Sequence, residues 1–266
     1  MKLLVKILLL TLWIAIAAGV IVMMGFANET HGVKLCKGLN CSIEYKGGQP
    51  LVSADELIAD INTKFGKQQA KAISEVNIAG ITSFVQHNPY LENTDVTMSI
   101  EGEIRIKAVQ CIPVIRYFTP GGQQHYIDRN GRIMPVRISY PYKALIATGQ
   151  IESPMNDGQN IFSVPDSNQV LRGQLKSLYD LYKLSGIIIA DSTLNALIEQ
   201  VYINTDGKIQ LVTKVGSHIV MLGDTTDAAE KLENLKYFYK FGLVKTGWNK
   251  YGKVNLEYKN QIVCTK

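Results

Sequence analysis

Histidines are the side chains of this sequence that most readily act as general bases or metal ligands. The four of them are scattered, and none stands at a spacing that predicts a metal site or a nucleophile–base pair. The sequence also lacks the G-x-S-x-G, H-E-x-x-H, G-x-x-x-x-G-K-[ST] and G-x-G-x-x-G motifs. We therefore expect no catalytic residue, no metal ligand and no cofactor. The histidines are His31, His87, His125 and His218.

Two groups of acidic residues have the right types for a carboxylate pair or a calcium loop. Asp224 and Asp227 are three positions apart, but they precede an expected helix, where acidic side chains cap the backbone and favour the dipole. The segment 128–131, Asp-Arg-Asn-Gly, superficially resembles a calcium loop, but its glycine comes too early and no glutamate closes the loop. We interpret the first group as a helix cap and the second as a turn.

Four cysteines are too few for a disulfide scaffold of this length. Cys36 and Cys41 are close enough in sequence to form a disulfide in an oxidising compartment, whereas Cys111 and Cys264 are far apart. No histidine accompanies them at a ligand spacing, so they do not indicate a metal site. A bridge between Cys36 and Cys41 and a pair of unbridged thiols both stay open, and the unbridged pair is favoured.

The composition is that of a folded chain with one strongly apolar segment. Hydrophobic residues make up 46% and charged residues 19% of the 266 positions, which excludes a disordered chain. The mean hydropathy of +0.03 is high for a water-soluble protein and far too low for a transporter with many spans. The length suffices for about two domains.

Positive charge is modest overall but uneven along the chain. The formal net charge of +5 does not mark a nucleic-acid binder. Residues 235–266, however, contain seven lysines and one glutamate. These lysines either cover solvated faces, which is the favoured interpretation, or face an acidic partner, phospholipid head groups or a cell-wall polymer.

The first 27 residues have the pattern of a membrane anchor. Residues 7–27 carry no charge, and at 1.5 Å per residue they would span about 31 Å, close to the thickness of a bilayer core. Lys2 and Lys6 precede this run, so the positive-inside rule predicts a cytoplasmic tail at 1–6 and an external body. A cleaved signal peptide is the alternative, but its apolar core would be unusually long. We expect an uncleaved transmembrane helix over 7–27.

The next part of the chain predicts a strand, two helices and two strands between about 41 and 110. Ser53 with Glu56 three residues later has the pattern of a capping box at a helix start. A second helix is expected from about Asn77 to the Asn88–Pro89 step. Alternating apolar residues then predict strands on either side of a turn at 101–102. A small three-stranded sheet with two helices on one face would bury these apolar stripes.

From about residue 112 the pattern changes to short strands with interspersed helices. Asp206-Gly207 between two apolar runs is a strong hairpin signal. The fold class expected overall is α+β: one N-terminal transmembrane helix, a βααββ module, and a mainly antiparallel β domain with helices. Strands are expected at 114–118, 124–128, 144–148, 201–203, 208–213, 217–222 and 253–259, and helices at about 171–185, 192–198 and 227–241.

Several short motifs follow one another in the order found in a known family. They are Asn88-Pro89-Tyr90, Pro113-Val114, Tyr126-Ile127-Asp128, Met134-Pro135, Gly247-Trp248-Asn249, Asn255-Leu256 and Tyr258-Lys259-Asn260-Gln261. With these motifs the chain resembles the FtsQ/DivIB family of bacterial cell-division proteins over nearly its whole length. Residues 28–111 resemble a POTRA domain and residues 112–266 the family's β domain. Cys111 departs from an arginine common in the family, and the segment 29–40 matches poorly.

The resemblance implies a non-enzymatic, single-pass scaffold of the cell inner membrane that works at the division septum. In the family the POTRA module serves targeting, and the late β region recruits the partners FtsL and FtsB. An unpaired edge of the last strand, carried over to residues 254–263, could pair with an extended partner segment. Core or hairpin packing is the alternative role for Trp248 and the two tyrosines. The candidate partner-binding residues are Trp248, Tyr251, Val254, Leu256, Tyr258, Ile262 and Val263.

Two other functions stay open at this point. One is a periplasmic or secreted POTRA-bearing factor for protein transport or assembly, which would normally add a barrel or further POTRA repeats. The other is an envelope hydrolase with an unrecognised site, which no residue of the sequence supports.

Overall fold

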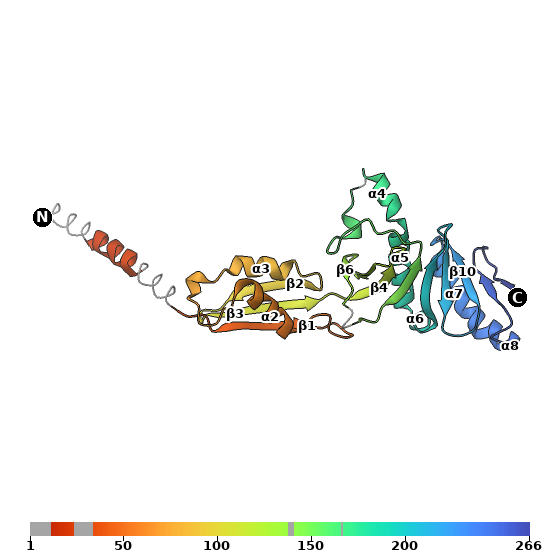
Figure 1. Ribbon diagram of the computed structural model, residues 1–266, viewed down its shortest axis with the longest axis horizontal. Coiled ribbons are helices and arrows are strands. Elements are labelled where there is room, and N and C mark those ends of the chain that lie inside the picture. Colours follow the sequence, from red (N-terminus) through yellow and green to blue (C-terminus); the bar gives the residue numbers. More distant parts are fainter. Residues whose placement is uncertain (1–11, 24–33, 138–140, 166) are drawn as a thin grey trace. The chain divides into compact units, whose positions relative to one another are not determined.

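The computed structural model describes residues 12–23, 34–137, 141–165 and 167–266, and these form an α+β fold (Figure 1). The chain divides into two compact units. The first unit contains the chain up to Glu44, Val52–Gln86 and Leu91–Val109. The second contains Gln110–Lys266 together with the short segments Tyr45–Leu51 and His87–Tyr90.

The first unit has the predicted order of strand, helix, helix, strand, strand. Its sheet has the order β1-β3-β2, and β1 runs parallel to β3. Gly102, with a φ of 86°, makes the turn between β2 and β3. The main elements are β1 (Gly38–Glu44), α2 (Ala54–Phe65), α3 (Ile78–Gln86), β2 (Leu91–Met98) and β3 (Glu103–Gln110), with a short 3₁₀ turn η1 (Ile73–Glu75) between the two helices.

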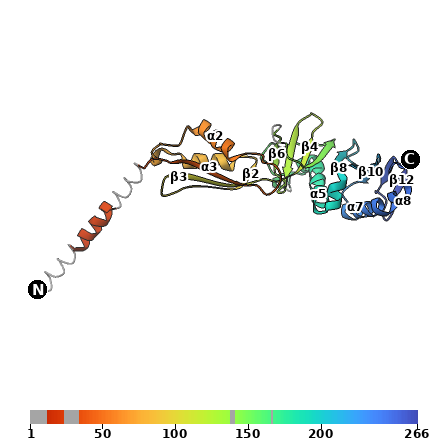
Figure 2. The ribbon, with the colours of Figure 1, turned by 90° about the horizontal axis from the view of Figure 1, so that it is seen from below.

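The helix α2 begins at the capping box that the sequence predicts. The Ser53 hydroxyl accepts a hydrogen bond from the Glu56 backbone N–H, and the Glu56 carboxylate accepts one from the Ser53 N–H, both at 3.1 Å. Leu57 and Ile61, one turn apart, are fully buried. Both helices lie on the same side of the three-stranded sheet (Figure 2), so this side holds the core of the unit.

The second unit is built on a nine-stranded sheet with the order β12-β11-β10-β9-β8-β7-β4-β5-β6. Among the described strands, the pairs β4–β7, β7–β8 and β10–β11 are parallel and the other five are antiparallel. The sheet is therefore mixed, with antiparallel pairs in the majority. Its strands are β4 (Pro113–Phe118), β5 (Gln124–Asp128), β6 (Ile133–Pro135), β7 (Leu145–Gly149), β8 (Ile198–Ile203), β9 (Ile209–Thr213), β10 (Ile219–Gly223), β11 (Lys253–Asn255) and β12 (Val263–Thr265).

Helices cover one face of this sheet. Leu178, Leu181 and Ile188 of α5 are fully buried and share a core cluster with the strand residues that face them. Figure 2 shows α5 and α7 on the same side of the strands. The helical elements are η2 (Ile161–Ser163), α4 (Gln169–Gln174), α5 (Lys176–Ala190), α6 (Ser192–Leu197), α7 (Ala228–Tyr237), the π-helical η3 (Phe238–Leu243) and α8 (Val244–Thr246).

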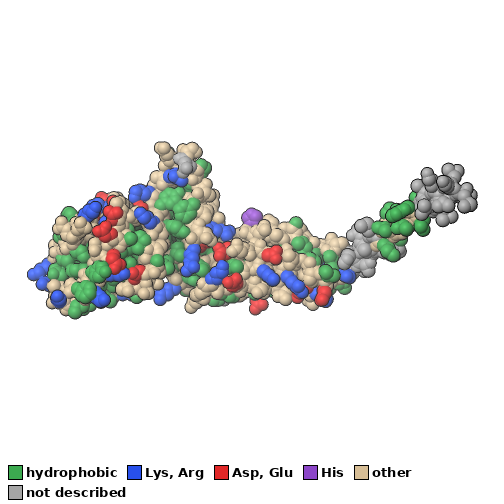
Figure 3. All heavy atoms as spheres, turned by 180° about the vertical axis from the view of Figure 1, so that it is seen from behind, with side chains coloured by type: hydrophobic (Ala, Val, Ile, Leu, Met, Phe, Trp, Pro, Cys, Tyr) green, Lys and Arg blue, Asp and Glu red, His purple; other side chains and the backbone are tan. Residues whose placement is uncertain are grey.

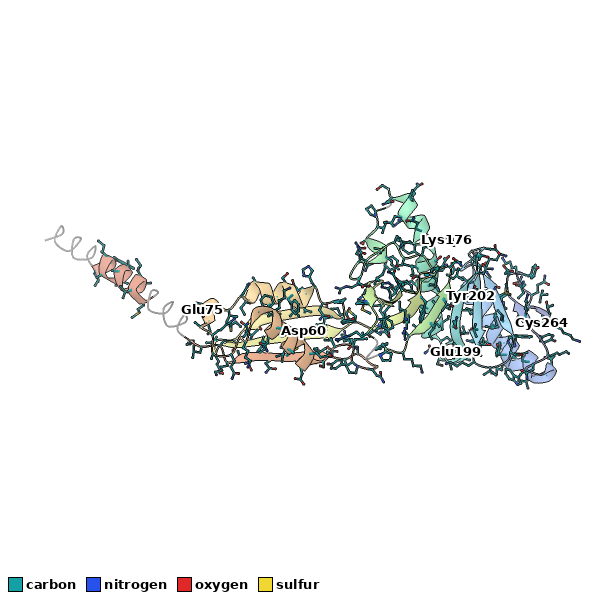
Figure 4. All side chains as sticks on the ribbon, viewed as in Figure 1. Asp60, Glu75, Lys176, Glu199, Tyr202 and Cys264 are labelled. Atoms are coloured by element: carbon teal, nitrogen blue, oxygen red, sulfur yellow. The ribbon has the colours of Figure 1, made fainter. Side chains whose placement is uncertain are left out.

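The opposite face of the sheet is less covered. In β8 the buried residues Val201 and Ile203 alternate with Tyr202, which keeps 37% of its surface in solvent. Glu199 is also exposed, at a β-bulge between Ile198 and Gln200 that interrupts the alternation. Figure 4 labels Glu199 and Tyr202 on β8. The alternation over 201–203 is typical of a sheet with one face packed on a core.

The structure contradicts the prediction of a transmembrane helix over 7–27. No helix in the described part of the chain is long and apolar enough to cross a membrane. Of the predicted range, residues 12–23 are described and helical. The remaining residues of that range and the predicted tail at 1–6 lie outside the described residues.

Two helices run past their predicted ends. The helix α5 continues through Ser185 and Gly186, because Ser185 is buried and its hydroxyl donates to the Tyr182 carbonyl at 2.8 Å instead of ending the helix. The helix that begins with α7 does not end at Gly242 but passes through η3 and α8 to Gly247, which has a φ of 96°. Glycine inside a helix is unfavourable by only about 1 kcal/mol, which tertiary packing overcomes.

The predicted last strand over 253–259 is also too long. The side-chain oxygen of Asn255 accepts a hydrogen bond from the Glu257 N–H at 2.8 Å, a local turn that ends β11. Asn260, with a φ of 60°, then turns the chain back toward β12.

Candidate functional site

The outermost strand of the large sheet at its C-terminal end is β12. It pairs with β11 on one side through the registers Lys253↔Thr265, Val254↔Cys264 and Asn255↔Val263. No described strand pairs with its other side. An open strand edge of this kind presents backbone N–H and C=O groups that can pair with an added strand. The strand β11 lies between β10 and β12, so the edge expected over 254–263 is confined to β12.

The side chains of β12 alternate between solvent and the core. Val263 is 39% exposed and Thr265 is exposed, whereas Cys264 packs against the core between them. Burial raises the pKa of the Cys264 thiol, which therefore stays protonated at neutral pH. Figure 4 labels Cys264 near the C-terminal end of the chain.

Four of the candidate partner-binding residues pack in or against the core of this unit. Val254 is fully buried and Leu256 is 3% exposed, and both belong to the core cluster. Tyr251 and Ile262 are half-buried and pack against the same cluster. Tyr251 thus packs against the core, which is the alternative role that the sequence left open for it.

The other exposed candidate near β12 is Tyr258. It keeps 55% of its surface in solvent and lies in the loop between β11 and β12. This loop faces the beginning of α7 across a cleft of about 210 Å³, which we call the terminal cleft. Its lining includes Asp224, Thr226, Asp227, Glu230, Lys231, Asn234 and residues 256–262.

Acidic groups predominate among the free charges of the terminal cleft. Asp227 and Glu230 are exposed and form no ion pair with any described residue, and Lys259 is the one free lysine of the lining. Asp224 accepts hydrogen bonds from the Thr226 N–H at 3.0 Å and from Lys231 at 3.3 Å. These contacts, the backbone N–H first, lower the pKa of Asp224.

A salt bridge and a hydrogen bond hold the neighbouring carboxylate of Glu257 in place. The Lys208 ammonium donates to Glu257 at 2.6 Å, and the Asn255 amide donates to its other oxygen at 3.1 Å. The contact with Lys208 is the largest cause of the lowered pKa of Glu257. The loop before β12 is therefore tied to the β8–β9 hairpin as well as to its own strand.

The interpretation of Asp224 and Asp227 as helix caps needs a correction. Asp227 stands at the first position before α7 with a left-handed φ of 52°, but its side chain makes no capping hydrogen bond. Asp224 instead orders the turn that precedes it. The sequence pattern did not reveal that these acids face the loop at 256–262, because that contact depends on the sheet order and not on local spacing.

The structure separates Trp248 from the other candidates. Tyr258 and Ile262 line the terminal cleft, with Val263 next in the chain, whereas Trp248 lines a different groove. Trp248 contacts Tyr239 edge-on, with 5.8 Å between the ring centroids. The seven candidates therefore do not form one surface.

The cysteines at 36 and 41 and the acidic turn at 128–131 are the remaining candidates for chemistry in the sequence. Cys36 and Cys41 are free thiols, and burial together with the nearby Asp55 raises the pKa of Cys41 to about 11. Asp128 accepts hydrogen bonds from the N–H groups of Asn130 and Arg132, both at 2.8 Å, as a turn requires. No group of three or more His, Cys, Asp or Glu side chains in the described part could hold a metal ion.

Comparison with known families matches the second unit. The family model described as FtsQ/DivIB, C-terminal related, matches residues 112–265, which is more than half of the chain. The chain therefore belongs to the FtsQ/DivIB family, and the resemblance drawn from the sequence motifs is confirmed at this level. This is a non-enzymatic family of cell-division proteins that interact with other proteins of the division machinery. No curated protein matches the chain.

Proposed function

We propose that this protein is a non-enzymatic scaffold of the bacterial division machinery that recruits FtsL- and FtsB-type partners through β12. The observation that carries the proposal is the open outer edge of β12 in a chain of this family. An extended partner segment would pair with the backbone of Val263–Thr265 and continue the sheet by one strand.

Side chains next to this edge would supply specificity. Val263 is available to an apolar residue of the added strand, and Tyr258 is a large, rigid anchor beside the terminal cleft. Asp227 and Glu230 would favour a basic side chain of the partner over an acidic one. The mode combines backbone pairing, which gives affinity, with a side-chain pocket, which gives selectivity.

We further propose that the protein acts at the division septum and that residues 28–111 form a POTRA-like targeting domain, with 112–266 as the partner-binding domain. The order strand, helix, helix, strand, strand of the first unit supports this assignment. The family membership supports the location at the division site.

The test is binding of the purified full chain to an FtsL–FtsB complex from the same organism, measured by biolayer interferometry. Removing residues 254–266 would also remove Val254 and Leu256 from the core, so the sharper variant lacks only 263–266. We expect this variant to bind at least about tenfold more weakly, equivalent to about 1.4 kcal/mol, because the pairing edge is gone.

Tyr258→Ala should weaken the same interaction without affecting folding, because the side chain is more than half exposed. Lys107→Glu, on an outward position of β3 in the first unit, is the matched surface control and should bind like the unaltered chain. Unchanged affinity in the chain that lacks 263–266, with its circular dichroism intact, would contradict the proposal.

A further inference from the structure

A groove with several apolar lining residues lies in the same unit and shares no residue with the terminal cleft. We call it the Trp248 groove. It has a volume of about 610 Å³, which is within the range of binding pockets. Its lining consists of Thr193, Leu197, Val215, Glu233, Lys236, Tyr237, Tyr239, Lys240, Val244 and Trp248.

A hydrogen-bonded cluster holds the floor of this groove. The Tyr239 hydroxyl lies 2.8 Å from the Thr213 hydroxyl and 2.5 Å from Nε2 of His218, and all three residues are buried. The Trp248 ring rests edge-on against Tyr239. The π-helical stretch η3 carries Tyr239 to the inside, and π-helical insertions of this kind occur often at functional sites. The groove is thus preformed.

Large apolar side chains line the rim and face solvent. Tyr237 is 56% exposed, Val244 is 65% exposed and Trp248 is 38% exposed. Phe241, 53% exposed, stacks on Tyr237 with 6.3 Å between ring centroids. Figure 3 shows hydrophobic side chains interspersed with Lys and Arg over the C-terminal unit. Four large exposed apolar side chains around one groove indicate an interaction site.

The charge around the groove is positive. Lys240 lines it, and Lys245 follows the lining residue Val244 in the chain. Neither of these two exposed lysines has an ion pair with a described residue.

The acid of the groove lining is already neutralised. Glu233 pairs with Lys236 at 2.7 Å, and Lys236 also pairs with Asp191 at 2.6 Å. The basic stretch at 235–266 therefore supplies Lys240 and Lys245 beside an apolar groove. Lys240 lies over the Phe241 ring at 5.3 Å from its centroid, and neither lysine has a carboxylate partner among the described residues. The complementary ligand is apolar on one side and acidic at its margins.

We propose that the Trp248 groove binds an acidic amphipathic helix of a protein partner, independently of β12. Such a helix would place aliphatic residues spaced by three and four positions against Trp248, Tyr237 and Val244, with glutamate or aspartate facing Lys240 and Lys245. A concave surface whose tryptophan is more than half buried fits a helix ridge. A flat lipid surface would leave the concave floor at Tyr239 and Trp248 unfilled, whereas a helix ridge fills it.

The test uses the full chain in a Trp13→Phe background, so that tryptophan emission reports Trp248 alone. The probe is an 18-residue peptide of leucine and glutamate with leucine at helical spacing. Its controls are the same peptide with lysine for glutamate and a version with scrambled leucine positions. We expect the acidic helix to change Trp248 emission on binding and to bind at least tenfold tighter than either control.

Two variants locate the site without disturbing the core. Lys240→Glu with Lys245→Glu, and separately Val244→Glu, should each weaken binding of the acidic helix at least tenfold, since all three side chains are exposed. The matched control Lys67→Glu with Lys107→Glu makes the same charge change in the first unit and should leave binding unaltered.

Several results would overturn the proposal. These are absence of binding by the acidic helix, equal binding of the scrambled or lysine peptide, or full binding by both groove variants. Binding of anionic phospholipid vesicles that Val244→Glu abolishes would assign the groove to a lipid surface, and dimerisation abolished by the same change would assign it to a second copy. The chain lacking 263–266 should bind the peptide normally, so failure of this proposal and of the β12 proposal are separable.

Discussion

The beginning and the end of the helix formed by α7, η3 and α8 border two different surfaces. Near its beginning, Asp227 and Glu230 face the terminal cleft beside β12. Toward its end, Lys240 and Lys245 adjoin the Trp248 groove. Acids at a helix beginning and bases at its end also match the helix dipole, so the charges alone do not establish two sites.

The difference lies in what accompanies the charges. The terminal cleft is small, at about 210 Å³, and adjoins an open strand edge, so backbone pairing dominates there. The Trp248 groove is larger, at about 610 Å³, and has exposed aromatic residues but no strand edge. We infer that the two surfaces take partner segments of different secondary structure and opposite charge.

The largest expected effect separates core residues from surface residues among the candidates. Leu256→Ala should lower the free energy of unfolding by about 2–5 kcal/mol, because a buried leucine is lost and a cavity is left. Tyr258→Ala should change it by no more than about 0.5 kcal/mol, because the side chain is exposed. Urea denaturation followed by circular dichroism measures both values. A stable Leu256→Ala chain would return Leu256 to the candidate binding residues.

Local sequence signals predicted the elements of the fold well where one residue pair decides the structure. The capping box of Ser53 and Glu56 and the hairpin at Asp206-Gly207 both form at the predicted positions. The family resemblance also followed from motif order. The predicted helix end at Ser185 was wrong because that residue is buried in the core, which local spacing does not reveal. The predicted length of the last strand was wrong because a local turn at Asn255 ends β11.

The candidate site could be predicted only in part. The alternation of Val254, Leu256 and Tyr258 predicts a strand, of which only the part up to Asn255 forms, and it does not say whether that strand lies inside the sheet or at its edge. That distinction rests on the pairing of β11 with β10, a contact between segments about 30 residues apart. The grouping of Trp248 with Tyr239 and Val244 likewise depends on the π-helical stretch, which no spacing rule anticipates.

Charge reversal should distinguish the two surfaces by partner. Asp227→Lys with Glu230→Lys should weaken binding of the FtsL–FtsB complex about tenfold, or about 1.4 kcal/mol, through lost attraction to a basic partner group. The same variant should bind the acidic helix peptide as well as the unaltered chain does. Biolayer interferometry at low and high salt measures both affinities, and the effect should shrink at high salt. Equal losses for both ligands would mean that the two surfaces act as one.

The smallest expected effect is a dependence of stability on pH just below neutrality, which arises on the groove side. The lowered pKa values of Asp224 and Glu257 at the terminal cleft act at lower pH. Burial lowers the pKa of His218 below its ordinary value of 6.5, and the nearby Trp248 carbonyl partly opposes this shift. Tyr239 and Thr213, its other neighbours in the cluster, are neutral at these pH values. The folded state therefore favours neutral His218, and its contribution to stability is present above pH 6.5 and is lost as the pH falls below it.

For a single proton this loss is at most about 1.4 kcal/mol per pH unit. His218→Gln keeps a polar partner for Tyr239 but does not titrate, so it should unfold with a smaller loss between pH 6.5 and pH 5 than the unaltered chain. Urea denaturation at each pH measures the two slopes, and Trp248 emission in the Trp13→Phe background reports whether the groove opens first. Because β12 has no such group beside it, the chain lacking 263–266 should keep the slope of the unaltered chain. Equal slopes for His218→Gln and the unaltered chain would show that the buried imidazole does not couple the groove to pH.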